Sequence, residues 1–355
     1  MAAALIVILG IVTAIRVRLL NFPLQRDEGE FAYAGQLLLQ GISPYKAAYT
    51  VTLKLPGTFI GYALIMAIFG QTSSAIHAGV ILINLASAVL VFLMARRIFG
   101  DPAGVVATGT YALLSIIPVT MGLAAHATHF VMLFALAGIL LLQDLSETTS
   151  LKRIFFAGLL LGLSFIMKQT GIAFGLFGAS WVAWVELSQK SRQWRRLLKR
   201  LGFLLMGGSL PFILTCIIVT ATGDLGHFWF WAFQYAAEHG LVFTLRSGLI
   251  SLFDHVSQQF AAAPGLWSLA ILGLILVFCD QALRSWRFFI AALSFFSFLA
   301  VCPGWYFRGH YFIQLLPAAG LLAATAFYVA TNFLSRQNSR VLRAVPVLIF
   351  AVAAA

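Results

Sequence analysis

Long apolar runs, separated by short polar segments, occupy most of this 355-residue chain. Several runs approach or reach the roughly 20 residues that a helix needs to cross ~30 Å of hydrocarbon. Because backbone groups cannot stay unpaired in lipid, such runs are expected to be helices. They lie near 2–20, 57–71, 76–95, 103–125, 129–143, 154–167, 170–185, 201–222, 263–279, 286–303, 311–334 and 344–355. The pattern predicts an all-α polytopic membrane protein.

One of these runs, 57–71, differs from the others, because it is short and follows Pro56. If every run crossed the membrane from a cytoplasmic N-terminus, Arg96, Arg97 and the basic stretch 190–200 would face outside. That arrangement violates the positive-inside rule. A 57–71 helix that rests in the interface or re-enters returns these residues to the cytoplasm. The sequence therefore predicts about 11 transmembrane helices.

This topology separates the charged residues between the two sides of the membrane. Fifteen of the 23 basic residues fall in cytoplasmic loops: Arg96, Arg97, Lys152, Arg153, Lys190, Arg192, Arg195, Arg196, Lys199, Arg200, Arg284, Arg287, Arg336, Arg340 and Arg343. The external side receives two large loops, 21–75 and 223–262, within a single domain that covers 1–355. Apolar residues at helical spacing predict an amphipathic surface helix over 28–40. The last run stops abruptly, which leaves open whether the chain continues past Ala355.

Composition agrees with this class of protein. Hydrophobic residues make up 61% of the chain and charged residues only 10%, and the mean hydropathy is +0.95. A soluble domain carries about 25% charged residues, so a water-soluble fold is excluded. The net charge of +12 follows from basic cytoplasmic loops, so nucleic acid is not expected as a partner. The three cysteines are isolated and indicate neither a disulfide framework nor a zinc motif.

Ionisable residues far apart in the sequence meet at the external face in this topology. Asp27 and Glu30 are spaced like a capping box, so Asp27 has a capping interpretation beside a catalytic one. Lys54 fits either an interfacial anchor or a phosphate contact. Lys168 follows an apolar run, where an ionisable residue is a functional-site hypothesis by default. Arg308 fits a bidentate grip on a phosphate or a place among lipid headgroups.

His126 and His129 are three residues apart at the external end of an expected helix. At this spacing both side chains point to one side and form half of a metal site. No further ligands with diagnostic local spacing accompany them. No cofactor is therefore assigned, and a divalent metal at these two histidines stays an alternative.

At these residues the sequence resembles bacterial members of glycosyltransferase family 39, the protein O-mannosyltransferase and lipid A aminoarabinose transferase relatives of the GT-C class. The matching features occur in order from about residue 26 to 320. They are Asp27-Glu28 with Glu30-Phe31-Ala32-Tyr33, Gly41 with Pro44-Tyr45, Lys54 before Pro56, Phe69-Gly70, Arg96-Arg97 with Phe99-Gly100, Gly158 through Gly162 to Lys168, and His310-Tyr311 to Pro317. The resemblance implies a GT-C helical bundle with surface helices in the first external loop.

The resemblance also implies a lipid-linked donor and an essential acid in the first loop, which falls on Asp27 with Glu28 beside it. It supports Lys54 as a donor-phosphate contact, and we assign Arg308 and Lys168 to the same role. The residues expected to bind substrate are Glu30, Tyr33, Tyr45, His129, His310 and Tyr311. The sequence departs from the aminoarabinose branch at Leu53, where that branch has an acid, and His129 stands where several relatives carry an acid.

The expected function is a membrane glycosyltransferase that moves a hexose or pentose from a polyprenyl-phosphate donor to an acceptor hydroxyl with inversion. A carboxylate base at Asp27 would take the proton of the acceptor hydroxyl. The acceptor is a glycan, a lipid or a protein, and membrane lipids surround the enzyme. The expected location is the bacterial cytoplasmic (inner) membrane with the site facing the periplasm. A lipid or solute transporter or flippase is the alternative, although transporters place their sites near the midplane of the membrane.

Overall fold

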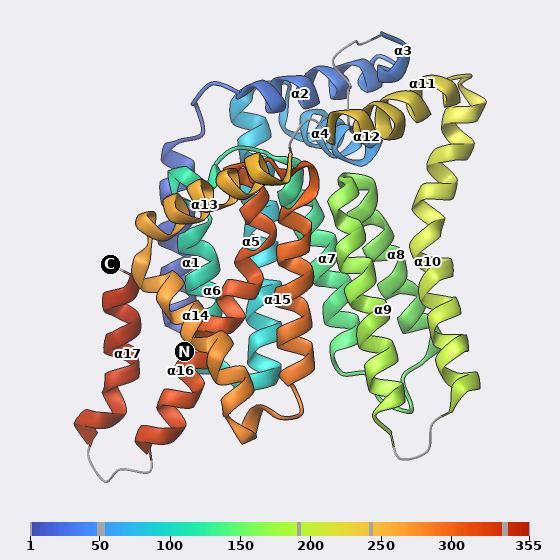
Figure 1. The fold of residues 1–355 in the computed structure, drawn as a ribbon. Helices are drawn as coiled ribbons and strands as arrows, with labels where there is room; N and C mark the ends of the chain where they lie inside the picture. Colours follow the sequence, from blue (N-terminus) through green and yellow to red (C-terminus); the bar gives the residue numbers. More distant parts are fainter. Residues whose placement is uncertain (1, 48–53, 190–192, 241–243, 336–339, 355) are drawn as a thin grey trace.

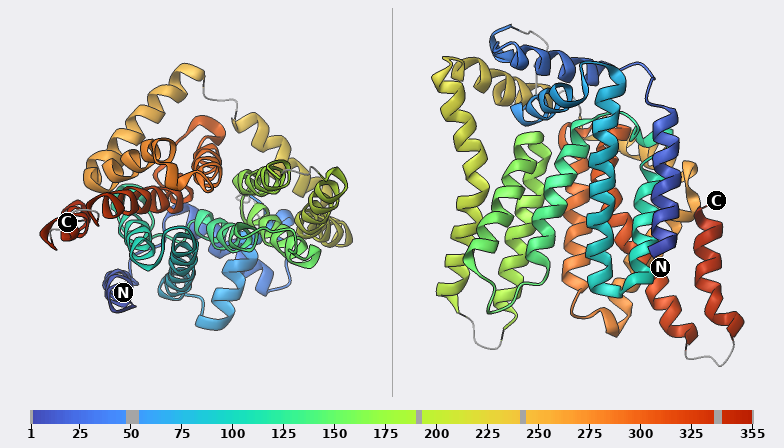
Figure 2. Two further views of the ribbon diagram at one scale, coloured as in Figure 1. Left: turned by 90° about the horizontal axis from the view of Figure 1, so that it is seen from below. Right: turned by 180° about the vertical axis from the view of Figure 1, so that it is seen from behind.

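The computed structural model describes residues 2–47, 54–189, 193–240, 244–335 and 340–354, and these residues form helices and connecting turns without a strand. Most helices run side by side along one axis (Figures 1 and 2). They are α1 (Ala2–Arg18), α5 (Ser73–Phe99), α6 (Asp101–Leu114), α7 (Ala127–Gln143), α8 (Leu151–Met167), α9 (Ile172–Leu187), α10 (Trp194–Ala221), α14 (Pro264–Cys279), α15 (Arg287–Val301), α16 (Leu316–Ser335) and α17 (Arg340–Ala354). The predicted all-α bundle is confirmed.

Length and composition qualify four helices of the described chain as membrane spans, namely α5, α9 with its preceding turn, α10 and α16. A fifth span is obtained if the bent pair of α13 (Leu245–Ala262) and α14 counts as one. The two helices meet at 111°. Ala263 leaves the helical region, and Pro264 lacks the N–H that would continue α13, so the chain turns there from the surface into the bundle.

Another group of helices covers one end of the bundle (Figure 1). It consists of α2 (Arg26–Leu39), α3 (Pro44–Ala47), α4 (Pro56–Phe69), α11 (Leu225–Trp229), the π-helix Phe230–Gln234, α12 (Tyr235–Gly240) and α13. Helix α2 buries Phe31, Ala34 and Leu37 on one face, as its spacing predicts. Helix α4 is the segment expected not to cross, and it lies against α2 at this end. We call this end external.

Two expected spans begin or end differently in the structure. The run 103–125 is not one helix, because α6 ends at Leu114 and a 3-10 turn, Pro118–Thr120, follows. Pro118 cannot donate the backbone hydrogen bond that an uninterrupted helix needs. The buried Arg16 guanidinium takes up carbonyl groups freed at this break, donating to the Ser115 oxygen at 3.1 Å and the Gly122 oxygen at 2.9 Å. The run 311–334 likewise starts as a 3-10 helix, Gly309–Gln314, before α16.

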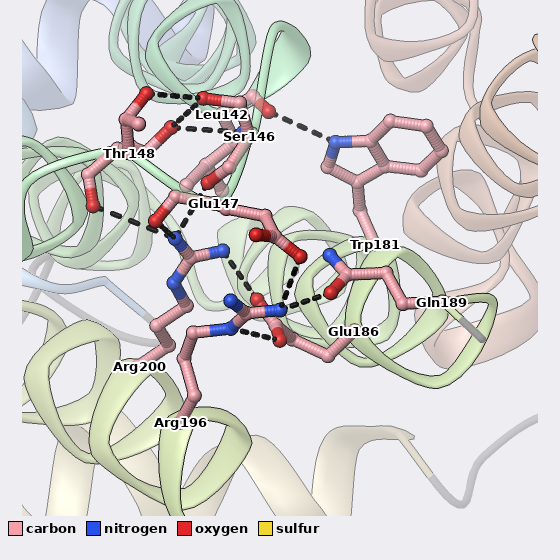
Figure 3. A network of polar contacts seen from close by, with 10 residues as sticks. Leu142, Ser146, Glu147, Thr148, Trp181, Glu186, Gln189, Arg196 and Arg200 are labelled. Carbon is pink, nitrogen blue, oxygen red and sulfur yellow. Dashed lines mark hydrogen bonds and ion pairs between the residues drawn. The ribbon is translucent and has the colours of Figure 1, made fainter. Parts of the chain in front are cut away.

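At the opposite end of the bundle, a buried ionic network joins the connection between α7 and α8 to α9 and α10 (Figure 3). Glu186, at the end of α9, accepts hydrogen bonds from Arg196 at 2.7 Å and from Arg200. Arg200 also donates to the backbone oxygen of Ser146 at 2.6 Å. We call this cluster the Glu186 network. Lys190, Arg192 and Arg336, assigned by the sequence to cytoplasmic loops, lie outside the described residues.

Candidate active site

Asp27 is the second residue of α2, and the way this helix begins determines what Asp27 is free to do. The N-cap is Gln25, whose backbone N–H donates to the Glu28 carboxylate at 2.8 Å. The capping contact therefore belongs to Gln25 and Glu28, and the capping interpretation of Asp27 with Glu30 is wrong. Asp27 instead contacts the Arg26 guanidinium at 3.2 Å and keeps 20% of its side chain exposed.

Glu28, expected beside Asp27 as a catalytic residue, lines neither of the two cavities that contain Asp27. Its side chain is fully buried, accepts from the Ala125 N–H at 2.6 Å and lies 3.1 Å from His77 Nε2. Burial raises the pKa of Glu28, but the hydrogen bonds from His77 and the two backbone amides outweigh it and hold the pKa below its usual range. Glu28 thus ties the start of α2 to α5 and to the turn before α7, and the catalytic expectation for it is corrected.

Asp27 shares a cavity of about 140 Å³ with the cationic residues that the sequence singled out. Lys54, Lys168 and Arg308 line it, brought together from the start of α4, the end of α8 and the turn before α16. The other lining residues are Arg26, Glu30, Phe31, Leu55, His126, Ala127, Met167, Gln169, His310 and Tyr311. We call this space the lysine cavity.

Aromatic rings and one carboxylate hold these cations in place. Lys54 pairs with Glu30, and its Nζ lies 4.4 Å from the centre of the Phe31 ring. Lys168 Nζ lies 3.9 Å from the centre of the Tyr311 ring. Cation–π contacts of this kind fix an ammonium without neutralising it. Lys54 is therefore held by Glu30 and Phe31, and Lys168 by Tyr311, at the edge of the same cavity.

The electrostatics of the cavity favour an ionised Asp27 and a readily deprotonated Lys168. Burial raises the pKa of Asp27, yet the nearby charge of Lys54 and of other cationic groups lowers it below the usual range. Burial lowers the pKa of Lys168 to about 7. An anion bound between Asp27 and the lysines would restore the charge of Lys168, because opposite charge favours the ionised form.

Two histidines stand beside Asp27, but they are not the expected pair. His126, the N-cap of α7, stacks on His310 with ring centres 4.0 Å apart and planes inclined by 11°. Burial lowers the pKa of His126 to about 4. His129 is buried, with only 1% of its surface exposed, and its Nε2 lies 2.9 Å from the Gly122 backbone oxygen. The expected pairing of His126 with His129 is therefore corrected, because α7 begins at Ala127 and leaves His126 outside the helical spacing.

A second cavity, of about 290 Å³, borders the same central residues. It shares Arg26, Asp27, His126, Arg308 and His310 with the lysine cavity. It adds Gln25, Met121, His255 and Gly309. We call it the His255 cavity. Asp27 thus faces two spaces, of which only one contains the lysines.

Two tyrosines expected to bind substrate line neither of these cavities. Tyr33 lies on the outer face of α2 and is 47% exposed. Tyr45 is buried, and its hydroxyl donates to the backbone oxygen of Lys54 at 3.0 Å, so it positions the segment that carries Lys54. Sequence reasoning missed Arg26, Gln169 and His255. Only Arg26 gave a local signal, because it is adjacent to Asp27.

An apolar groove of about 670 Å³ runs between α8, α9 and α10. Gly158, Gly162 and Gly208 lie on it where α8 and α10 pack closely against each other. The aromatic rings of Phe165, Phe212 and Phe233 line it. Its external end lies near the lysine cavity, because Phe165 is three residues from Lys168.

Solved structures show which fold this is. The chain is similar to ArnT from Cupriavidus metallidurans bound to undecaprenyl phosphate, with a TM-score of 0.60, 17% identity, and coverage of 99% of this chain and 69% of that one. It is similar to the apo Archaeoglobus fulgidus oligosaccharyltransferase, with a TM-score of 0.59, 13% identity and coverage of 99% and 54%. It is also similar to the oligosaccharyltransferase AglB from Archaeoglobus fulgidus in complex with an inhibitory peptide and a dolichol-phosphate. That match has a TM-score of 0.57, 11% identity, and coverage of 99% of this chain and 54% of that one. The fold is that of the GT-C membrane glycosyltransferases.

The sequence also matches one protein family. Residues 56–219 match the family described as dolichyl-phosphate-mannose-protein mannosyltransferase. No curated protein sequence matches the chain significantly. The chain spans about half the length of the archaeal oligosaccharyltransferase. The expected resemblance is thereby confirmed at the level of the fold, and the family match covers residues 56–219.

Proposed function

We propose that this protein transfers a sugar from a polyprenyl phosphate to an acceptor hydroxyl at the external face of a membrane. The observation that carries the proposal is the lysine cavity, where Asp27 shares one partly buried space with Lys54, Lys168 and Arg308. A carboxylate suits proton removal, and cations suit a departing phosphate. Polar groups with these two roles are what glycosyl transfer from a phosphate requires.

In the proposed reaction, the acceptor oxygen forms a bond to the anomeric carbon while the bond from that carbon to the phosphate oxygen breaks. Asp27 accepts the proton of the acceptor hydroxyl, and the electron pair of the broken bond leaves on the polyprenyl phosphate. Lys54 and Arg308, with Lys168, stabilise the charge that the phosphate gains. Because Asp27 has a lowered pKa, it is ionised and ready to act at neutral pH.

The apolar groove supports a donor carried on a lipid. It provides a long apolar surface that ends near Lys168, which suits a polyprenyl chain whose phosphate reaches the lysine cavity. Two similar structures contain such lipids, undecaprenyl phosphate in ArnT and dolichol-phosphate in AglB. A soluble nucleotide sugar would have no use for this groove.

The His255 cavity is the proposed route for the acceptor. Asp27 borders both cavities, whereas Lys54 and Lys168 line only the first. An acceptor that enters through the His255 cavity would approach the sugar from a side other than that of the departing phosphate. Such an approach inverts the anomeric configuration. The acceptor is a glycan, a lipid or a protein, and the sugar is a hexose or a pentose.

We assign the enzyme to the bacterial cytoplasmic membrane, with the site facing the periplasm. The basic residues of the loops at the opposite end of the bundle support this orientation. The transporter alternative gains no support from the cavities, because both lie under the surface helices of one end.

The proposal is tested by mixing purified protein with radiolabelled polyprenyl-phosphate sugars and a membrane extract, and by identifying the labelled product. We expect acceptor-dependent loss of label from the lipid fraction together with release of polyprenyl phosphate. Asp101→Asn, at an exposed carboxylate on the other end of the bundle, is the matched control for Asp27→Asn. Label that crosses the membrane of a proteoliposome without transfer would favour a transporter.

A further inference from the structure

A contact between the two external loops lies outside both cavities. Lys46, on α3, donates to the Thr222 backbone oxygen at 2.8 Å, and its Nζ lies 3.4 Å from the Asp224 carboxylate. Asp224 is fully buried, whereas 55% of the Lys46 side chain is exposed. Among the residues that the structure describes, Lys46 alone forms an ion pair with this carboxylate. We call this contact the Lys46 clasp.

The backbone at the end of α10 fixes the position of Asp224. The Gly223 N–H donates to the Thr220 oxygen at 3.0 Å, and the Asp224 N–H donates to the Val219 oxygen at 2.9 Å. These two bonds form a Schellman motif, which satisfies the last carbonyl groups of a helix. Gly223 has a φ of 74°, a conformation that glycine adopts without a steric penalty. Asp224 is therefore held at the end of a helix that also forms one wall of the apolar groove.

The residue before Lys46 carries the clasp to Lys54. Helix α3 lies against α11 at the external end (Figure 1), and the buried Tyr45 ring packs edge-on against Phe228 with ring centres 5.3 Å apart. The Tyr45 hydroxyl donates to the Lys54 backbone oxygen at 3.0 Å. Phe228 in turn lies 6.4 Å from the ring centre of Phe212, which lines the apolar groove. A continuous set of contacts thus runs from the groove to the segment that carries Lys54.

We propose that the Lys46 clasp positions Lys54 for the donor phosphate, which makes Lys46 and Asp224 positioning residues. Helix α3 has only four residues, and helices this short do not form stably on their own. The clasp and the ring contact with α11 hold it. Because Asp224 follows α10, they fix Lys54 relative to the groove where the lipid chain of the donor is proposed to lie. The inference rests on the proposed function, in which Lys54 stabilises the departing phosphate.

A clasp that only joins the two loops would give different kinetics from one that positions Lys54. In the first case, loss of the ion pair lowers the unfolding midpoint and leaves kcat and KM of the folded molecules unchanged. In the second case, Lys54 is misplaced, and a displacement of about 1 Å costs as much as 10²-fold in rate. The kcat/KM for the donor therefore distinguishes the two roles.

The test measures transfer from the labelled donor by Lys46→Met and by Tyr45→Phe, which removes only the hydroxyl bonded to Lys54. We expect each to lower kcat/KM between about tenfold and a hundredfold, and Lys46→Arg, which keeps the charge, to recover most of it. Arg96→Met is the matched control, because Arg96 is 54% exposed and pairs with Asp101 at 2.6 Å at the opposite end of the bundle. The control should have wild-type kinetics.

The variant Lys46→Met is then combined with Lys54→Gln. If the clasp acts through Lys54, adding Lys46→Met to Lys54→Gln should cause little further loss, because residues that share one contact are not additive. A full additional loss in the double variant, or wild-type kinetics of Lys46→Met alone, would overturn the inference. If Lys46→Met does not fold, Tyr45→Phe takes its place in the cycle, because it keeps the ring that packs against Phe228.

Chemical labelling of the Lys54 amine separates this inference from the proposed function. The Lys54 side chain is 18% exposed, and we expect an acetylating reagent to modify it faster in Lys46→Met and Tyr45→Phe than in the wild type or Arg96→Met. The exposed Lys199 serves as the internal reference in the mass spectrum. If the wild type shows no transfer, the proposed function fails and faster labelling still supports the clasp. Unchanged labelling of Lys54 overturns the clasp whatever the activity.

Discussion

Two ionic clusters at opposite ends of the bundle differ in how completely their polar atoms are bonded. In the Glu186 network, Arg200 is 1% exposed, and its guanidinium bonds both the Glu186 carboxylate and backbone carbonyls (Figure 3). At the external end, His126 and His310 keep unpaired nitrogens and Asp27 faces two cavities. Polar groups that bond one another fully stabilise the fold, whereas groups left open in a buried place are available to a ligand.

Substitution of Asp27 should have the largest effect on transfer. Asp27→Asn keeps the shape of the side chain and lies outside the cap of α2, so folding should be unchanged while transfer falls by roughly 10²–10⁴-fold. Because the pKa of Asp27 is lowered, activity of the wild type should persist until the pH falls below the ordinary aspartate value of about 3.9. Product formation with labelled donor measures both. Near-normal turnover of Asp27→Asn would remove Asp27 as the base.

At the other end, Arg200→Met should affect stability and leave the chemistry intact. It leaves Glu186 buried with only Arg196 as a cationic partner, and breaking a buried pair costs roughly 3–5 kcal/mol. We expect a lower unfolding midpoint in detergent and normal activity per folded molecule. Arg195→Met is the matched control, because Arg195 is exposed. A loss of turnover with unchanged stability would show that the network is more than structural.

The kcat and KM of Lys54 variants distinguish three interpretations of this residue. An interfacial anchor predicts little change in Lys54→Gln, because one charge near an anionic surface contributes about 1 kcal/mol. A contact equal in ground and transition states predicts a higher KM alone. A group that stabilises the departing phosphate predicts a kcat lower by roughly 10²–10³-fold, which is our expectation. Lys54→Arg should recover part of it, and Lys152→Gln, at an exposed lysine, should act like the wild type.

The smallest expected effect is a pH dependence caused by Lys168. Burial lowers its pKa to about 7, so its positive charge is present below that pH and is lost as the pH rises through it. The kcat/KM for the donor should therefore fall above about pH 7. Lys168→Arg keeps the charge at high pH and should move this fall upward. An identical pH profile in Lys168→Arg would exclude Lys168 as the titrating group.

Much of the fold followed from hydrophobic pattern and charge. Backbone groups in lipid require helices, and the long apolar runs did form helices. The positive-inside rule distinguished α4, because a crossing there would have put Arg96 and Arg97 outside. The ends of individual helices were harder to predict. The run 103–125 carries no charged residue and was expected as one span, yet α6 ends at Leu114, before Pro118.

The sequence by itself determined the class of protein and the helices near 28–40 and 57–71, but not the helices of the 223–262 loop. It also singled out Asp27, Lys54, Lys168 and Arg308, because charge is costly near a membrane and therefore conspicuous. Only the tertiary structure decided which of several candidate side chains face the cavities. Asp27 faces the cavities while Glu28 is buried against His77. His126 pairs with His310, which is distant in the sequence, rather than with His129. Which side chain faces which space depends on how α2, α7 and the turn before α16 pack together, and spacing along one helix does not contain that information.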